Sequence, residues 1–154
     1  MPNWCMNTVY VSHEDSSKID EFKKACESSD GLFQHFVPRP ESEEDNWYAW
    51  NIENWGTKWD VEGDGVQVFE QDENKISVSF DTAWGPPIEF FRKLEEDHEY
   101  KVLAYYMEEG MNFCGIYRED DNEEYELDDD LPQDLDECFG ITEMLKEREE
   151  EENG

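Results

Sequence analysis

Residues 75–107 read KISVSFDTAWGPPIEFFRKLEEDHEYKVLAYYM, and this stretch decides the fold. Apolar and polar side chains alternate over 75–80, and apolar or aromatic residues dominate 101–107, which predicts a β-strand at each end. Between them, a Gly-Pro-Pro turn at 85–87 places proline at the start of a helix. The apolar stripe of this helix recurs at helical spacing and consists of Ile88, Phe91 and Leu94.

The segments before this stretch show the same succession of strand and helix. Residues 4–11 alternate β-branched and aromatic side chains with polar ones, which predicts a first strand. Ser16 or Ser17 is expected to cap a helix that ends near Ser28. The apolar positions of this helix share one face and are Ile19, Phe22 and Cys26.

The region that follows the first helix contains three further predicted elements. Residues 32–37 are expected to be extended, because they precede a Pro-Arg-Pro sequence and proline disfavours helix in the residue before it. Another helix is expected from Ser42, since the acids in its first turn suit the positive end of a helix dipole. Residues 65–70 should pair with 75–80 through a turn at 71–74.

Residues 112–118 and 124–127 add two strand patterns to the end of this series. The order strand, helix, strand, strand, helix, strand predicts an α+β, ferredoxin-like split βαβ arrangement, with an antiparallel sheet and helices on one face. We assign this domain to residues 1–118. Residues 119–154 form an acidic extension, in which a docked helix is expected over about 134–148. Its docking residues would be Leu135, Cys138, Ile141 and Leu145.

Charge is the strongest signal about partners. The 154 residues include 43 acids and 12 bases, which gives a formal net charge of −31. Such a surface repels nucleic acid and anionic membranes and attracts proteins with basic clefts. A small domain needs a net charge of only about 2–8 for solubility, so the excess calls for another explanation. The chain is nevertheless expected to fold, because aromatic residues make up 14% of it and can form a core.

Four aromatic-rich motifs occur in a fixed order along the chain: MPNWCMN at 1–7, NWGTKWD at 54–60, FDTAWGPP at 80–87 and EEGMNFCG at 108–115. Together they resemble the YubB-like/Api92-like ferredoxin-like proteins over residues 1 to about 118. The resemblance implies a ferredoxin-like fold and an origin in a phage, a prophage or a conjugative plasmid. It implies no established activity, because the function of this family is unknown.

Trp4, Trp55, Trp59 and Trp84 in these motifs allow two interpretations. They could line a binding pocket whose polar groups come from Lys58, Asp60 and Asp81. The favoured interpretation is that all four indoles are buried in one aromatic core cluster. The hydrogen-bonding frame of that core would be Asn3, Asn7, Thr57, Asp60, Asp81 and Thr82.

Catalytic and metal-binding motifs are missing from the sequence, which indicates a protein that is not an enzyme and needs no cofactor. No P-loop, GxGxxG or GxSxG sequence occurs, and the three histidines lack the spacing of a zinc site. Residues 60–65 begin like a calcium loop, but Gln71 stands where that loop requires glutamate. Dense acids such as Asp128–Asp130 are expected to hold divalent cations only weakly.

The location is expected to be the cytoplasm of a host cell. The first residues lack the features of a signal peptide, and no apolar run reaches the roughly 18 residues of a membrane span. The four cysteines share no CxxC motif, so free and mostly buried thiols are expected rather than disulfides.

The acidic extension is the expected partner-binding surface. Duplex DNA carries one negative charge per roughly 1.7 Å of axis, and closely spaced carboxylates can imitate this density. The leading hypothesis is a DNA-mimicking inhibitor of a basic, nucleic-acid-binding host defence protein. The alternatives are a structural or adaptor protein whose acidity serves solubility, and a small-ligand or cation-binding module. The candidate residues are Asp120, Asp121, Glu123, Glu124, Asp128, Asp129, Asp130, Asp134, Asp136 and Glu137.

Overall fold

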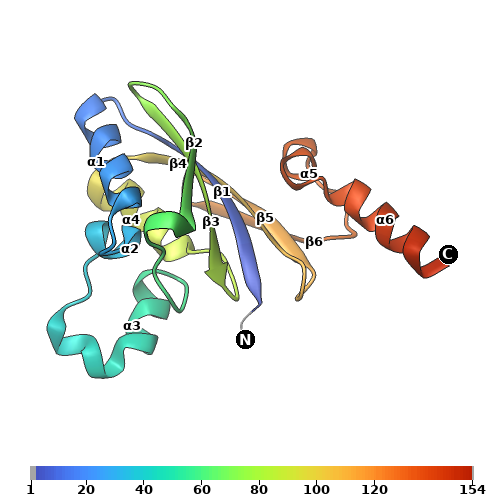
Figure 1. Ribbon diagram of the computed structural model, residues 1–154, viewed down its shortest axis with the longest axis horizontal. Helices are drawn as coiled ribbons and strands as arrows, with labels where there is room; N and C mark the ends of the chain where they lie inside the picture. Colours follow the sequence, from blue (N-terminus) through green and yellow to red (C-terminus); the bar gives the residue numbers. More distant parts are fainter. Residues whose placement is uncertain (1–2, 154) are drawn as a thin grey trace.

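A computed structural model describes residues 3–153, so Met1 and Pro2 of the first motif lie outside the described residues. The strands form one six-stranded antiparallel sheet in the order β2-β3-β1-β4-β5-β6 (Figure 1). The strands are β1 (Trp4–Ser12), β2 (Val66–Gln71), β3 (Lys75–Ala83), β4 (Lys101–Glu108), β5 (Phe113–Arg118) and β6 (Asp121–Glu126).

The first four strands have the ferredoxin-like order. Helix α1 (Ser16–Glu27) follows β1, and helix α4 (Ile88–His98) connects β3 to β4, which lies on the other side of β1 from β3. The predicted split βαβ arrangement is therefore confirmed. Strands β5 and β6 extend the sheet beyond β4, so the sheet continues across the expected domain boundary at residue 118.

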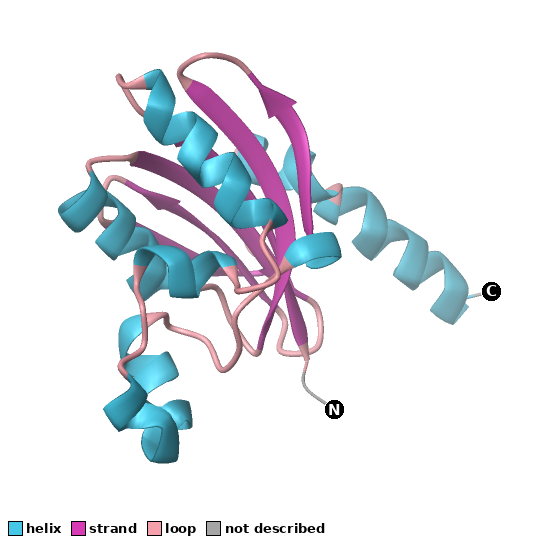
Figure 2. Ribbon diagram, turned by 60° about the vertical axis from the view of Figure 1, so that its left-hand side comes forward, coloured by secondary structure: helices cyan, strands magenta, loops and turns pink. Residues whose placement is uncertain are grey.

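One face of the sheet, here called the core face, packs against α1, α2 (Leu32–Phe36) and α4 (Figure 2). Alternate residues of each strand point to this face, for example Val9 and Val11 of β1, and both are buried. Phe33 lies at its centre, with its ring 4.4 Å from that of Phe90 and 5.7 Å from that of Trp55. Burial of large rings thus provides the core that the composition predicts.

The prediction that residues 32–37 are extended is wrong, since residues 32–36 form helix α2. The carboxylate of Asp60 caps this helix by accepting hydrogen bonds from the backbone N–H groups of Phe33 (2.7 Å) and Gln34 (2.9 Å). Gly31 precedes the helix with φ of 103°, and a Cβ there would lie 2.0 Å from the Asp60 carboxylate. The capping group is 27 residues away from Phe33, so local sequence could not reveal it.

Two predicted helix starts also differ from the structure. Helix α1 is capped by Asp15 rather than by Ser16 or Ser17, because the Asp15 carboxylate accepts a hydrogen bond from the backbone N–H of Ser17 (3.0 Å). The helix expected from Ser42 is a 3₁₀ helix, η1 (Glu41–Asn46), which continues as α3 (Trp47–Asn54). A short 3₁₀ turn, η2 (Gly63–Gly65), precedes β2.

The opposite face of the sheet, here called the outer face, is covered only in part. Two helices, α5 (Gln133–Phe139) and α6 (Ile141–Asn153), lie on this side next to β4 and β5 (Figure 1). The single helix expected over 134–148 is broken at Gly140, whose φ of 63° is in the left-handed region. Leu135 and Ile141 are fully buried against this part of the sheet, and Cys138 and Leu145 are partly buried there.

The four cysteines are free thiols, and burial raises the pKa of each above its ordinary value. Cys5, Cys26 and Cys114 are buried and Cys138 is half-buried. Burial raises the pKa of Cys26 to about 12 and that of Cys114 to about 11. Within residues 3–153, none of the helices is both long and apolar enough to cross a membrane.

Candidate partner-binding surface

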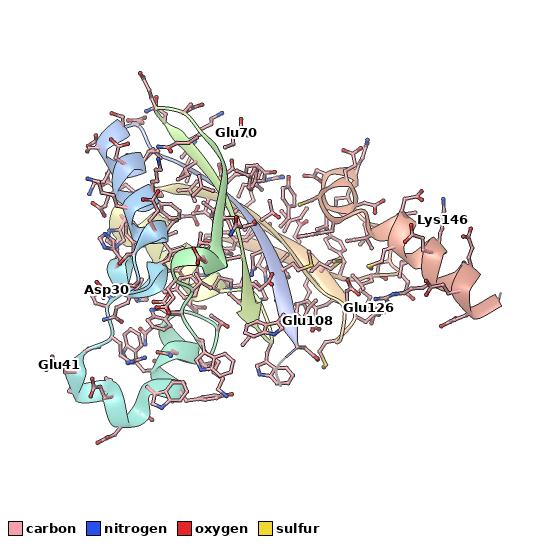
Figure 3. All side chains as sticks on the ribbon, viewed as in Figure 1. Asp30, Glu41, Glu70, Glu108, Glu126 and Lys146 are labelled. Carbon is pink, nitrogen blue, oxygen red and sulfur yellow. The ribbon has the colours of Figure 1, made fainter. Side chains whose placement is uncertain are left out.

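Strand β6 forms one edge of the sheet and carries exposed carboxylates along its length. Asp121, Glu123, Glu124 and Glu126 are exposed, and the loop after the strand continues with Asp128–Asp130. We call these seven residues the acidic edge. Figure 3 shows the side of the molecule on which it lies, with Glu126 at the end of β6 and Lys146 on the neighbouring α6. Glu126 was not among the predicted residues, although it lies in the same acidic run.

No lysine or arginine in residues 3–153 forms an ion pair with the acidic edge. Glu123 accepts a hydrogen bond from the Tyr125 hydroxyl (2.8 Å), and Asp129 accepts one from the backbone N–H of Glu126 (2.8 Å). Neither donor carries a positive charge. The negative charge of this surface is therefore available to a basic partner.

Two predicted site residues are instead paired with arginines within the protein. Asp120 pairs with Arg92, with Nε and Oδ1 2.9 Å apart. Asp134 accepts a hydrogen bond from the Tyr105 hydroxyl (2.8 Å) and lies 3.4 Å from a guanidinium nitrogen of Arg118. These internal partners offset part of the charge that we had assigned to partner binding.

Asp136 has a structural role at the break between α5 and α6. Its carboxylate accepts hydrogen bonds from the hydroxyl (2.6 Å) and backbone N–H (2.7 Å) of Thr142. These bonds lower the pKa of Asp136, and the residue caps the start of α6. Glu137, the last predicted residue, is exposed and accepts a hydrogen bond from the Gln133 side chain (2.8 Å).

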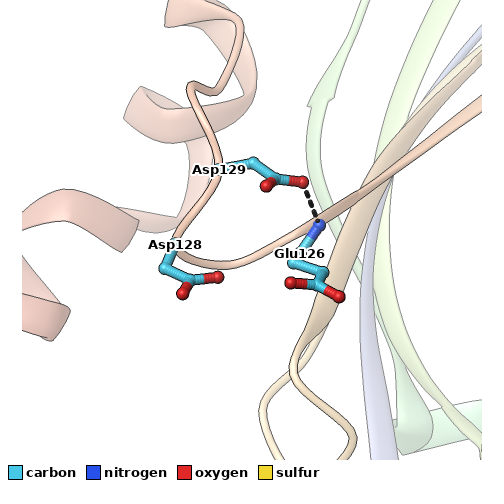
Figure 4. Close-up of side chains that lie close together, drawn as sticks. All are labelled: Glu126, Asp128 and Asp129. Carbon is cyan, nitrogen blue, oxygen red and sulfur yellow. Dashed lines mark hydrogen bonds between the residues drawn. The ribbon is translucent and has the colours of Figure 1, made fainter.

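Three carboxylates at one end of the acidic edge lie close together. Oxygen atoms of Glu126, Asp128 and Asp129 all fall within 4.8 Å of one another (Figure 4). All three side chains are exposed, so a divalent cation bound here would keep most of its contact with water. This arrangement fits the weak cation association expected of any dense carboxylate surface.

The favoured interpretation of the four tryptophans as one buried cluster is wrong. Trp55 is 2% exposed and belongs to the core, but Trp4 and Trp84 are each 48% exposed and Trp59 is 38% exposed. Trp4 points to the outer face at a position that α5 and α6 do not cover. Trp84 lies in the turn after β3 with φ of 71°, outside the regular strand.

The predicted hydrogen-bonding frame does form at four of its six positions. The buried Asn7 amide donates to the Thr82 hydroxyl (2.9 Å) and to the Phe80 carbonyl (3.2 Å), which joins β1 to β3. The Thr57 hydroxyl donates to the carbonyl of Ala83 (3.0 Å). Asp60 serves as the cap of α2 and also accepts a hydrogen bond from its neighbour Val61 (2.7 Å).

Trp4 and Trp59 line a pocket together with Asp60 and Asp81, which matches half of the pocket interpretation. The two ring centroids are 6.2 Å apart and the planes meet at 35°. The pocket has a volume of about 330 Å³, and Glu62 adds a further carboxylate to its wall. Trp55, Trp84 and Lys58 are not among its lining residues.

Comparison with known proteins places these features in a family context. A family model described as the ferredoxin-like domain in Api92-like protein matches residues 54–153. The match includes the acidic extension, so the family likeness does not end at residue 118 as expected. A crystal structure of the protein Api92 from Yersinia pseudotuberculosis is similar, with a TM-score of 0.48 and 17% identity. The alignment covers 60% of this chain and 39% of that one. No curated protein matches the sequence.

Proposed function

The chain belongs to the family of Api92-like ferredoxin-like proteins, and we propose that it is a non-enzymatic protein that binds a basic, nucleic-acid-binding protein through its acidic edge. The observation that carries this proposal is the row of exposed carboxylates on β6 without basic partners among the described residues. The lysines and arginines of a partner's cleft would not have to displace a lysine or arginine of the described chain from these carboxylates. Opposite charges at this density favour fast and salt-sensitive association.

The density of the charges supports mimicry of nucleic acid as the mode of binding. Successive residues of a β-strand advance by about 3.3 Å and their side chains alternate between the two faces, so acids on one face recur about every 6.6 Å, against roughly 3.4 Å between successive charges along one strand of duplex DNA. Four of the six residues of β6 are acids. Leu127 follows the strand, and the next three residues, Asp128–Asp130, are acids as well. A cleft that tracks phosphates with lysine and arginine would meet carboxylates on both faces of this edge strand and in the loop after it.

Such binding would inhibit the partner by denying it access to DNA. In a protein of phage or plasmid type, a host defence protein that acts on nucleic acid is the expected target, and the cytoplasm is the expected place of the encounter. The proposal includes no catalytic step and no cofactor.

A second candidate is a structural or adaptor protein whose acidity keeps it soluble. This candidate is favoured by the wide distribution of acids, since exposed carboxylates also occur on η1 and α4, far along the chain from the acidic edge. Under this alternative, the total charge would matter and its position would not.

The test compares two variants with the same change in charge. The edge variant neutralises Asp121, Glu123, Glu124, Asp128, Asp129 and Asp130 by amide substitution. The control variant neutralises six exposed acids elsewhere, namely Asp20, Glu41, Glu44, Asp45, Glu96 and Asp97. Circular dichroism first establishes that both variants fold. A partner isolated from host lysate at low salt is then bound to labelled duplex, and each protein is added as a competitor.

We expect the wild type and the control to displace duplex at similar concentrations, and the edge variant to be at least tenfold weaker. Single substitutions would do little, because an exposed ion pair contributes only about 0–1 kcal/mol. Equal weakening of both variants would favour the solubility alternative. Failure of the wild type to displace duplex would overturn mimicry.

A further inference from the structure

The uncovered part of the outer face exposes several large apolar side chains. Along β1, three of the residues that alternate with the buried core positions are Trp4, Met6 and Tyr10, which are 48%, 42% and 36% exposed, whereas Thr8 between them is half-buried beside Cys138 of α5. Helices α5 and α6 pack next to β4 and β5 and leave this part of the sheet open (Figure 1). Exposed large rings on a protein this polar mark a contact surface rather than a requirement of folding.

The pocket at the Trp4 end of this surface combines two features that attract cations. Its aromatic wall consists of Trp4 and Trp59, whose π-faces bear partial negative charge. Its polar wall carries the carboxylates of Asp60, Glu62 and Asp81, and no basic residue is among the lining residues. Both walls therefore favour a positively charged ligand.

Asp81 is the carboxylate that remains available for direct contact. It forms no hydrogen bond or ion pair with another residue of the described chain, although the surrounding protein removes part of its hydration and so raises its pKa. Both oxygens of Asp60, by contrast, already accept backbone N–H groups. Asp60 thus contributes its charge to the pocket, whereas Asp81 can also contribute a hydrogen-bond acceptor.

The structure contains one internal example of the same interaction. The Lys58 ammonium lies 4.4 Å from the centroid of the Trp59 ring and 5.3 Å from that of Tyr48. The Trp59 ring therefore already serves as a cation-binding surface within the protein. Because Lys58 does not line the pocket, it leaves the cavity beside Trp4 and Asp81 open.

We propose that this pocket binds the guanidinium group of an arginine side chain of the protein partner, stacked on an exposed indole face and paired with Asp81. Arginine fits better than lysine, because its planar group stacks on aromatic rings and offers a fork of donors to a carboxylate. Nucleic-acid-binding proteins present such arginines to phosphates. The assignment of the arginine to a partner rests on the proposed function, whereas binding of a guanidinium by the isolated protein does not.

The test uses the whole protein and three blocked amino acids. Indole N–H signals of the tryptophans are followed by ¹H–¹⁵N NMR during titration with N-acetyl-arginine amide, and Trp→Phe variants assign them. The matched probes are the corresponding derivatives of lysine, which keeps the charge, and of citrulline, which keeps the shape without the charge. Saturable shifts are expected for Trp4 and Trp59 with arginine, and small shifts for the exposed Trp84. Lysine should bind a few-fold more weakly, and citrulline should cause little change.

Two variants with equal charge changes complete the test. Asp81→Asn should weaken arginine binding about fivefold, whereas Asp20→Asn at an exposed position of α1 should leave it unchanged. Equal shifts of all exposed indoles, or equal effects of the two variants, would show non-specific attraction and overturn the proposal. That result would leave the acidic-edge proposal standing, because its test depends on competition with duplex by variants that retain Asp81.

Discussion

The two faces of the sheet use aromatic residues in opposite ways. On the core face, Phe33, Trp55 and Phe90 are buried against one another under the helices. At the Trp4 end of the outer face, Trp4 lies beside Trp59 of the loop after α3, but both residues remain more than a third exposed. The same residue type is therefore buried on one face and exposed on the other. The difference comes from what covers each face and not from the side chains themselves.

The largest expected effect is a loss of stability on the core face. Phe33→Ala should lower the free energy of unfolding by about 3–5 kcal/mol, because it removes a fully buried ring that the surrounding structure cannot replace. Phe69→Ala on the outer face is the control, since Phe69 is 52% exposed, and it should change stability by less than about 1 kcal/mol. Urea denaturation measures both. Similar losses in the two variants would contradict the contrast between the faces.

Helices α5 and α6 should detach from the outer face of the sheet by local unfolding, without unfolding of the rest of the domain. The double variant Leu135→Ser/Leu145→Ser removes apolar contacts of α5 and α6 with the sheet and should cost about 2–5 kcal/mol of local stability. Limited proteolysis should then cut near residues 127–140 sooner than in the wild type, while the rest of the domain persists. Unchanged cleavage kinetics would show that these helices do not depend on docking.

Acidification should stabilise the protein at first. Burial raises the pKa of Asp60 to about 6, so between pH of about 4 and 6 the folded state binds more protons than the unfolded chain. The free energy of unfolding should therefore rise by about 1–3 kcal/mol as the pH falls from 7 through this window. High salt should be present in the urea titrations, because it screens long-range repulsion and isolates the buried group. At still lower pH, the lowered pKa of Asp136 has the opposite effect, because its capping interaction is lost on protonation. A flat profile between pH 7 and 5 would contradict the role assigned to Asp60.

The smallest expected effect concerns the break between α5 and α6. Gly140→Ala should cost about 1 kcal/mol, because φ of 63° strains any residue with a side chain. A Cβ there would meet no neighbouring atom, so backbone strain would be the whole cause. Gly65→Ala is a suitable control, since its Cβ also lies in open space and its φ is not positive. Equal thermal midpoints for the two variants would contradict this interpretation.

Sequence reasoning succeeded where structure depends on local periodicity and failed where it depends on distant groups. The alternation in β1 and β3 and the helical spacing in α4 are properties of contiguous residues, and these elements were predicted. Helix α2 was missed because its capping carboxylate, Asp60, comes from another part of the chain.

The features of the candidate site also fall into those that local sequence predicts and those that depend on tertiary contacts. The exposure of the acids of β6 was predicted because a dense run of carboxylates stays in contact with water. The exposure of Trp4 was not predicted, since it depends on where α5 and α6 end on the outer face. The internal pairing of Asp120 and Asp134 likewise depends on arginines brought near by folding.

The acidic edge has a consequence for self-association that is separate from any partner. An edge strand presents unpaired N–H and C=O groups to which another strand can add, and this is a common route to fibrous aggregation. A second copy that approached β6 edge to edge would place rows of carboxylates beside one another, which like-charge repulsion forbids at neutral pH. Concentrated salt screens this repulsion, so the barrier falls. The protein should therefore remain dispersed at low ionic strength and form sheet-extended assemblies in concentrated salt, under conditions in which its fold is still intact.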